Sequence, residues 1–422
     1  MAMQPRSTRS RNALLGFGVV GSMLAVGLVF LLATSVFGVG RGGVFGSHDF
    51  TYFTSAGEAW LNGESPYSLD ELNAAADRYY EGTPIDGEVE FEFVLFYPPQ
   101  FFPLAAISGG LPFDASRFGI AAITIAAAFA VGWVCLWCFR RDGGVTTTLL
   151  GSLAMGLAVS QTIGNPFVSH NIWMGQTSVV AAALMLGGFV LCCQGHAWFG
   201  AALLALGCFK PTLGVAIVPL AVVRWPKQTL IVMPIVGLAT AAYPLITQGP
   251  VQHTLEWLSA VGTYKSHPPN DPDFQHYFGV QSLIRSLGIP APKLIPLAAI
   301  AALAVILFRK RLSDCEQAAF SICIPIVLFQ GHDYDLIVLA PAIALLAARF
   351  SRSLVGLGTL IVGVLVLFVP LRMVLDFSGP PVIGRYREIV TVVMLTTLLV
   401  TTLARGRREP VSSAPIKEDQ PK

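Results

Sequence analysis

The stretch FGIAAITIAAAFAVGWVCLWCF, residues 118–139, carries no charged side chain and is followed directly by Arg140 and Arg141. A helix needs about 20 mostly apolar residues to cross the hydrocarbon core of a bilayer. Lys and Arg are enriched in the cytoplasmic loops between such helices. The stretch therefore predicts a membrane-spanning helix whose carboxyl end lies on the cytoplasmic side.

The composition of the whole chain agrees with this local reading. Of its 422 residues, 54% are hydrophobic and only 12% are charged, and the mean hydropathy is +0.65. Soluble domains carry about 25% charged residues. We therefore expect an all-α polytopic integral membrane protein, in contact with membrane lipids. The net charge of +2 gives no indication of a nucleic-acid partner.

Apolar runs of helical length recur along the chain and predict about 12 transmembrane helices. The predicted spans are Ala13–Gly38, Phe118–Phe139, Val145–Ile163, Thr177–Leu191, Ala197–Phe209, Thr212–Val223, Thr229–Ile246, Leu294–Phe308, Gln317–Phe329, Leu336–Ala348, Leu354–Val369 and Ile389–Leu403. The first has a basic flank and no small-residue cleavage site, so it is expected to be a retained span. Cys135 and Cys138 form a CxxC within the second, where packing is a more economical explanation than redox or metal chemistry.

A further apolar stretch, Phe93–Leu111, contains three prolines, and each proline in a helix interior removes a backbone hydrogen bond. If this stretch does not cross, the basic clusters after the spans all face the cytoplasm. We therefore expect it to dip into the membrane or lie at its surface.

This arrangement predicts a single transmembrane domain over residues 1–404, with two large extracytoplasmic loops at about 40–117 and 248–292. Residues 405–422 are expected to form a disordered cytoplasmic tail. The expected location is the plasma or inner membrane, crossed many times. The inner loops are short and basic, without acidic partners for a metal–diphosphate, whereas most histidines and exposed carboxylates are expected on the outer side.

Asp49 follows the first predicted span and sits between His48 and an aromatic run. Partial removal from water makes a carboxylate a stronger base at neutral pH, so Asp49 is a candidate general base and His48 a candidate substrate ligand. The alternative is a helix cap followed by an interfacial aromatic belt.

Other polar groups are expected at the same outer face. Tyr97 belongs to FYPPQFFPL, which suits either the wall of a lipid groove or a membrane-dipping anchor. His170 and Gln176 lie between two spans, where polar side chains usually line a cavity. Lys210 precedes Pro211 at the start of a helix and could clamp a phosphate or extend to the lipid headgroups.

The second outer loop and the later helix connections add further candidate ligands. These are His267, His332, Asp333, Arg372 and Arg385. In the segment HDYDL, His332 and the two aspartates could bind a divalent ion or cap the following helix. No metal or cofactor is predicted, although a divalent metal remains an open alternative. No nucleotide-binding motif such as GxxxxGK[ST] or GxGxxG occurs on the inner side.

Several short motifs resemble, in their order along the chain, those of glycosyltransferase family 87. They are an Asp after the first span, SPY at Ser65–Tyr67, FYPP at Phe96–Pro99, GQ at Gly175–Gln176, KP at Lys210–Pro211 and HDYDL at His332–Leu336. The resemblance implies a GT-C fold and inverting transfer of a sugar, usually mannose. It implies a polyprenyl-phosphate donor, an extracytoplasmic site, and an essential aspartate at the position of Asp49.

The resemblance and the residues together predict one activity. A hexosyltransferase, of the α-mannosyltransferase kind, would move the sugar to a hydroxyl of a glycolipid or cell-envelope glycan acceptor, with Asp49 as the base. The alternative is a transporter or flippase of a lipid-linked sugar, which would need a polar path through the membrane and often has repeated halves.

Overall fold

The computed structural model describes residues 21, 48–85, 87, 89–263, 277–290, 294–328, 331–369 and 381–406. For His48, Pro381 and Gly406 it describes the backbone alone. Apart from Gly21, the predicted first span Ala13–Gly38 lies outside the described residues.

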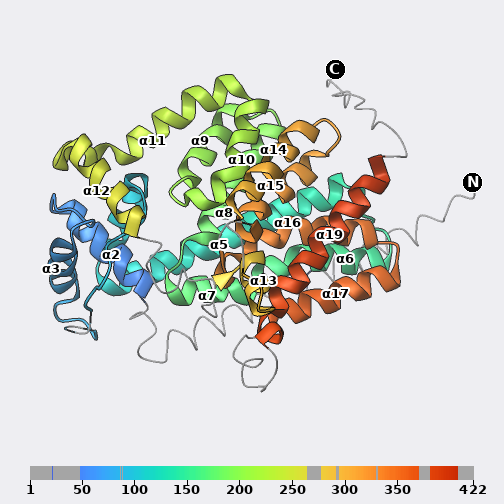
Figure 1. Cartoon of the computed structure of the whole chain (residues 1–422), viewed down its shortest axis with the longest axis horizontal. Helices are drawn as coiled ribbons and strands as arrows, with labels where there is room; N and C mark the ends of the chain where they lie inside the picture. Colours follow the sequence, from blue (N-terminus) through green and yellow to red (C-terminus); the bar gives the residue numbers. More distant parts are fainter. Residues whose placement is uncertain are drawn as a thin grey trace, which may run out of the picture.

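Every other predicted span contains a helix, and the chain is largely helical (Figure 1). These helices are α5 (Phe113–Arg141), α6 (Leu149–Ile163), α8 (Ser178–Cys193), α9 (Ala197–Gly207), α10 (Pro211–Arg224), α11 (Pro226–Gln248), α14 (Ile295–Phe308), α15 (Asp314–Leu328), α16 (Ala340–Phe350), α17 (Leu354–Phe368) and α19 (Tyr386–Gly406). Helix α16 is buried from Ala340 to Ala348, as expected for a helix that is apolar on all sides. All seven cysteines are free, and Cys135 and Cys138 pack in the core as predicted.

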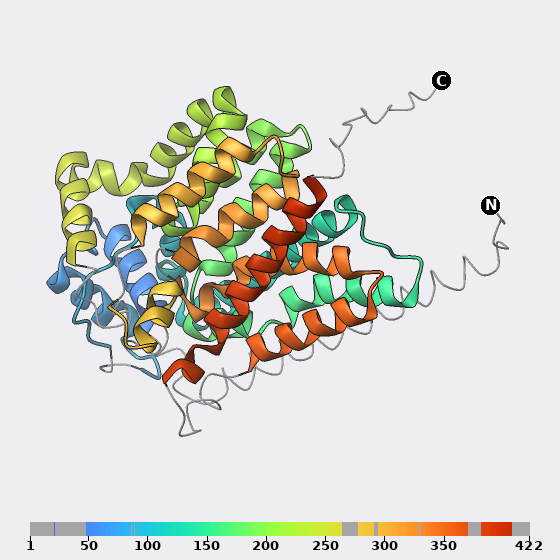
Figure 2. The same cartoon turned by 45° about the vertical axis from the view of Figure 1, so that its right-hand side comes forward.

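Three of the described helices are long and apolar enough to cross a membrane: Phe113–Arg141, Pro226–Gln248 and Val382–Arg405. Five shorter helices are also apolar. An integral membrane protein built from helices is therefore confirmed, whereas the number of 12 spans stays a prediction. Helices α17 and α19 pack together at the far end of the molecule from α2 and α3 (Figure 2).

The proline-rich stretch does not form a spanning helix, as predicted. Its first part lacks helix, η2 (Pro99–Phe101) is a single turn, and α4 (Phe102–Gly109) has 8 residues. A helix of that length is about 12 Å long at 1.5 Å per residue. The hydrocarbon core is about 30 Å thick, so α4 cannot cross it.

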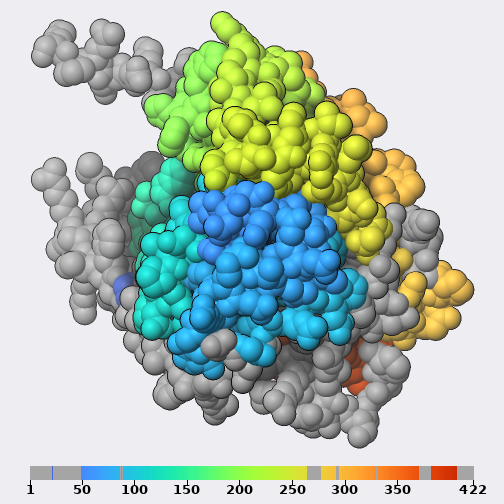
Figure 3. Space-filling view, turned by 90° about the vertical axis from the view of Figure 1, so that its left-hand side faces the viewer, coloured from blue at the N-terminus to red at the C-terminus, as the bar shows by residue number. Residues whose placement is uncertain are grey.

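Helices α2 (His48–Leu61) and α3 (Leu69–Tyr80) form the outer lobe of the described chain with α4 and α12 (Pro250–Thr263). Asp49 lies in the first turn of α2. A Cβ on Gly57 would be 1.9 Å from the carbonyl oxygen of Ala105, so glycine lets α2 and α4 touch through their backbones. Figure 3 shows α11 and α12 covering one edge of this lobe.

A short strand pair joins the predicted second outer loop to the segment that follows α15. Strand β1 (Tyr277–Phe278) pairs antiparallel with β2 (Gly331–His332), placing Tyr277 opposite His332. These are the two strands in the part of the chain that the structure describes, so the all-α class holds with this small exception.

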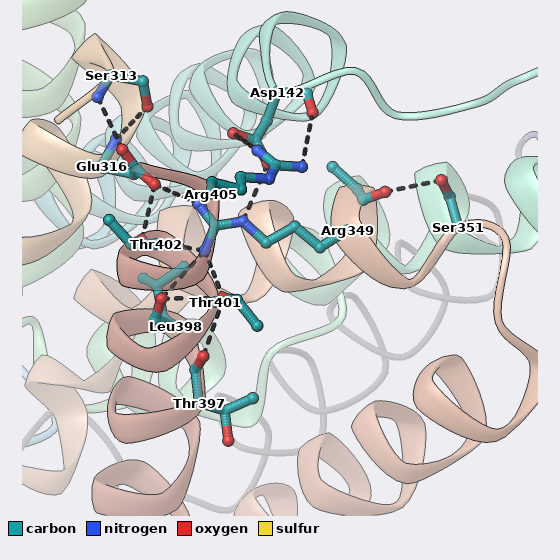
Figure 4. A network of polar contacts seen from close by, with 11 residues as sticks. Asp142, Ser313, Glu316, Arg349, Ser351, Thr397, Leu398, Thr401, Thr402 and Arg405 are labelled. Carbon is teal, nitrogen blue, oxygen red and sulfur yellow. Dashed lines mark hydrogen bonds and ion pairs between the residues drawn. The ribbon is translucent and has the colours of Figure 1, made fainter. Parts of the chain in front are cut away.

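At the helix ends that are predicted to face the cytoplasm, basic residues pair with carboxylates (Figure 4). Arg349 is ion-paired with Asp142, at 3.1 Å, and with Glu316. Arg405 lies 2.7 Å from Asp142, and the Thr402 hydroxyl donates to Glu316. Arg405 belongs to α19. This helix ends at Gly406, so it includes the first two residues of the predicted tail, which begins at residue 405. Asp142, Glu316 and Arg349 are buried because four helix ends converge there; sequence spacing alone could not indicate this.

Candidate functional site

The segment HDYDL forms a capped turn at the mouth of the helices. It comprises His332 of β2 and the start of η5 (Asp333–Leu339). The carboxylate of Asp335 accepts the backbone N–H of His332 at 3.0 Å, and the His332 side chain accepts the N–H of Asp335 in return. The predicted capping alternative is therefore confirmed. A ring nitrogen that accepts a hydrogen bond carries no proton, so the other nitrogen of a neutral His332 is a donor.

Lys210 takes the predicted position, between α9 and α10 with Pro211 as the first residue of α10. Its ammonium lies 2.6 Å from Asp335 Oδ1 and also donates to the Ser178 hydroxyl. That hydroxyl in turn donates to Asp335 at 2.6 Å. Burial opposes ionisation of Asp335, but Lys210, His332 and the Ser178 hydroxyl hold its pKa below the ordinary value. The three side chains thus form a compact charged cluster.

An ammonium group has three donor protons, and two of those of Lys210 are used by Ser178 and Asp335. Within the described part of the chain, the third has no acceptor oxygen. The ammonium also lies 5.1 Å from the ring centroid of Tyr334. Lys210 can therefore offer one hydrogen bond to a bound molecule while its charge is balanced by Asp335.

A second ion pair lies on the same turn, at Asp333. Arg387 of α19 donates to Asp333 at 2.9 Å, and His170 Nδ1 lies 3.9 Å from the other carboxylate oxygen. His170 belongs to α7 (Pro166–Met174), which is fixed to this turn by Asn171 donating to the Tyr334 carbonyl at 2.8 Å. The predicted residues His170 and Asp333 are thus brought together.

Asp49 approaches the same region through the start of α2. Gly175, which ends α7 with φ 70°, packs so closely on Phe50 that a Cβ would lie 2.6 Å from the Phe50 Cβ. Asp49 precedes Phe50 in the first turn of α2, so it lies beside this contact between α2 and α7.

Tyr97 links Asp49 to the Lys210 cluster. Its ring packs edge-on against Phe53 of α2, with centroids 5.0 Å apart, and its hydroxyl lies 3.3 Å from Thr177 Oγ1 and 3.4 Å from Gln176 Oε1. Burial raises the pKa of Tyr97, and the negative charges of Asp49 and Asp335 raise it further. Of the predicted residues, Tyr97 and Gln176 are therefore in direct contact.

Arg385, a predicted phosphate ligand, has hydrogen-bond partners within the chain. It donates to the Tyr277 carbonyl at 2.8 Å and to Glu388 at 3.3 Å. These bonds hold strand β1, and so the Tyr277 ring, opposite His332. Arg385 therefore has structural partners at the site's edge.

Three predicted ligands cannot be placed. The side chain of His48, and all of His267 and Arg372, lie outside the described residues, so their roles stay predictions. Conversely, Ser178, Tyr334 and Arg387 lie at the site although the sequence did not single them out as ligands, and Asp335 was considered there only as a metal ligand or helix cap. The available signal was the pair of aspartates in HDYDL, because buried carboxylates require cations. No group of three or more His, Cys, Asp or Glu residues in the described ranges has the arrangement of a metal site.

These features define an integral membrane protein of helices with a polar, charge-paired cluster gathered at one end of the helix bundle. The sequence model of glycosyltransferase family 87 matches residues 95–330, more than half of the chain. The protein therefore belongs to glycosyltransferase family 87 and is a membrane glycosyltransferase. No curated protein and no solved structure matches it significantly.

Proposed function

We propose that the protein transfers a sugar, mannose, from a polyprenyl-phosphate donor to a hydroxyl of a glycolipid or cell-envelope glycan, on the extracytoplasmic face of the plasma or inner membrane. Asp49 removes the proton from the acceptor hydroxyl while its oxygen attacks the anomeric carbon. The bond from that carbon to the phosphate oxygen breaks on the opposite side, so the configuration inverts.

The observation that supports this proposal is the position of Tyr97: its ring packs on α2, whose first turn holds Asp49, and its hydroxyl contacts Thr177, the residue before the Lys210 partner Ser178. A base and a phosphate donor group are needed on the two sides of a sugar carbon in a single displacement. The negative charges of Asp49 and Asp335 contribute to the raised pKa of Tyr97, and Asp335 is ion-paired with Lys210. The arrangement supports a base on one side and a hydrogen-bond donor for the leaving phosphate on the other.

The leaving phosphate requires donors and positive charge but no general acid. The third proton of Lys210 supplies one such donor. The nearby cations Lys210, Arg385 and Arg387 are each paired with a carboxylate, so the phosphate's charge must be balanced by further groups. The predicted ligands His267 and Arg372 are the candidates, and they lie outside the described residues.

The ion-pair network at the opposite helix ends supports a transferase over the transporter alternative. A flippase must open a path to both sides of the membrane. Here Arg349, Asp142 and Glu316 are buried together where α5, α15, α16 and α19 meet (Figure 4). Separating a buried ion pair leaves uncompensated charges and costs several kcal/mol, about 3–5. This cost disfavours opening of the helix bundle at the end that is predicted to face the cytoplasm.

The choice of donor tests the proposal. Purified protein in nanodiscs would receive either GDP-mannose or polyprenyl-phosphate mannose, with a mannoside glycolipid acceptor and no enzyme that interconverts the donors. We expect product from polyprenyl-phosphate mannose alone. Product from GDP-mannose alone would refute the proposed donor and the assignment of the site to the outer face.

A further inference from the structure

Trp173 is the one large aromatic residue of α7 that is exposed, to 40%, next to the charged cluster. Its ring lies 5.7 Å from that of His170, inclined by 45°. His170 is itself partly open, with 26% of its side chain exposed, and it contacts the Asp333–Arg387 pair. We name these four residues, Trp173, His170, Asp333 and Arg387, the α7 face.

We propose that the α7 face binds a pyranose ring of the acceptor, so that the accepting hydroxyl belongs to a sugar that stacks on Trp173. This inference rests on the proposed transfer reaction and specifies its acceptor class. Neither a simple lipid alcohol nor a protein hydroxyl would use such a face.

The chemistry of the face matches a neutral sugar. A pyranose presents C–H groups on one face, which pack on the negative face of an aromatic ring, and hydroxyls at its edge. The partly exposed imidazole of His170 can hydrogen-bond those hydroxyls, and the buried Asp333–Arg387 pair lies beneath it. Because Arg387 is balanced by Asp333 at 2.9 Å, the face does not attract a phosphate through excess positive charge.

The position of the face matches the acceptor side of the reaction. Trp173 is two residues before Gly175, which packs on Phe50, the neighbour of Asp49. The cluster of Lys210, Ser178 and Asp335 lies beyond Tyr334: the Lys210 ammonium lies over the Tyr334 ring, whereas the His170 ring meets it edge-on at 6.0 Å. The turn thus separates a phosphate side from the α7 face, and Phe50, the neighbour of Asp49, packs on the end of α7.

Helix α7, which carries Trp173 and His170, is held in place by contacts with neighbouring elements. Arg387 also stacks on Phe167 of the same helix, 5.0 Å from its ring centroid, and Phe167 is buried. Together with the bond from Asn171 to the Tyr334 carbonyl, this fixes α7 against η5 and α19. An exposed tryptophan on a rigid support binds with little loss of conformational entropy.

The test measures sugar binding separately from transfer. Saturation-transfer NMR would titrate methyl α-mannopyranoside onto the full protein in nanodiscs, with glycerol as a polyol that has no ring. We expect binding of the pyranoside, with a Kd raised tenfold or more in Trp173→Ala and largely restored in Trp173→Phe. Trp198→Ala is the matched control, because Trp198 is exposed to 49% on α9, away from the α7 face.

The outcomes separate the two proposals. No pyranoside binding in the wild type, or equal binding in Trp173→Ala, would overturn the α7 face as a sugar site. Equal losses in Trp173→Ala and Trp198→Ala would also overturn it, since they would indicate a general effect of interfacial tryptophans. Trp173-dependent binding without transfer from any donor would keep the sugar site and refute the proposed reaction.

Discussion

At the scale of single residues, Lys210 illustrates how burial changes a predicted role. The sequence placed it correctly before Pro211 at a helix start, but it could not indicate that Asp335, 125 positions away, would balance its charge. Lys210 can therefore hydrogen-bond a phosphate, but it brings no uncompensated charge. Removing it alone would leave Asp335 buried without its cation.

Because Lys210 is paired with Asp335, a test of Lys210 needs a variant that removes both charges. Lys210→Ala should lower stability by about 3–5 kcal/mol, because it leaves a buried carboxylate unpaired. The double variant Lys210→Met, Asp335→Asn removes both charges and should recover most of that loss in thermal melting. Both variants should raise the KM for the polyprenyl-phosphate donor at least tenfold, with little change in the acceptor KM. Donor use as efficient as in the wild type by the stable double variant would exclude a phosphate role for Lys210.

Other site residues were predictable because their types are costly at a membrane boundary. Asp49, His170, Gln176 and His332 stand out in an apolar sequence, and polar groups there usually have a function. Arg387 was missed because it follows Arg385 at the start of a helix, where a basic residue is ordinary. Only the fold brings it to Asp333.

At the scale of elements, α12 is attached to the outer lobe through a buried histidine. The indole N–H of Trp60 donates to His253 Nε2 at 3.1 Å, the Tyr67 ring lies 4.8 Å from the His253 ring, and Glu256 lies 3.8 Å from its Nδ1. Burial lowers the pKa of His253 to about 4, although Glu256 acts in the opposite direction. His253 is therefore neutral at pH 7 and accepts the bond from Trp60.

The low pKa of His253 predicts an acid-sensitive outer lobe. The unfolded chain binds a proton near pH 6.5 and the folded chain only near pH 4, so stability is full above 6.5 and falls as the pH drops to 4. The loss from this group should reach roughly 3 kcal/mol by pH 4. Thermal melting of the wild type and of His253→Gln, which keeps an acceptor for Trp60 but does not titrate, would measure it. Identical melting profiles of the two proteins between pH 6.5 and 4 would contradict this assignment.

The helices themselves were the most predictable part of the structure. Long apolar runs can satisfy their backbone groups in a membrane only as helices, so composition alone determined them. Helices α3, α7 and α12 were not predicted, because they are short and their apolar positions are mixed with polar ones. Strands β1 and β2 were also missed, since two-residue strands carry no periodic signal.

At the scale of the whole molecule, the predicted orientation places the α2–α3 lobe outside and the Arg349 network inside. The inner arginines are partly neutralised by Asp142, Asp314 and Glu316, but orientation follows Lys and Arg rather than net charge. The topology predicted from the sequence therefore stands unchanged as a prediction.

Labelling of introduced cysteines would test this orientation. In a cysteine-free background, Asp70→Cys on α3 should react with a membrane-impermeant maleimide in intact cells. Arg352→Cys, between α16 and α17, should react only after permeabilisation. Both positions are exposed, so access reports sidedness rather than burial. The reverse pattern would place the candidate site in the cytoplasm.

The central claim is that Asp49 is the base of a glycosyl transfer, and a conservative substitution tests it most directly. Asp49→Asn keeps the size and polarity of the side chain but cannot accept the proton. General-base catalysis contributes about 10²–10⁴ in rate. We therefore expect the turnover of polyprenyl-phosphate mannose to fall by that factor, with donor binding retained and with full activity in the control Asp114→Asn, which alters an exposed outer carboxylate. Wild-type turnover in Asp49→Asn would contradict the account.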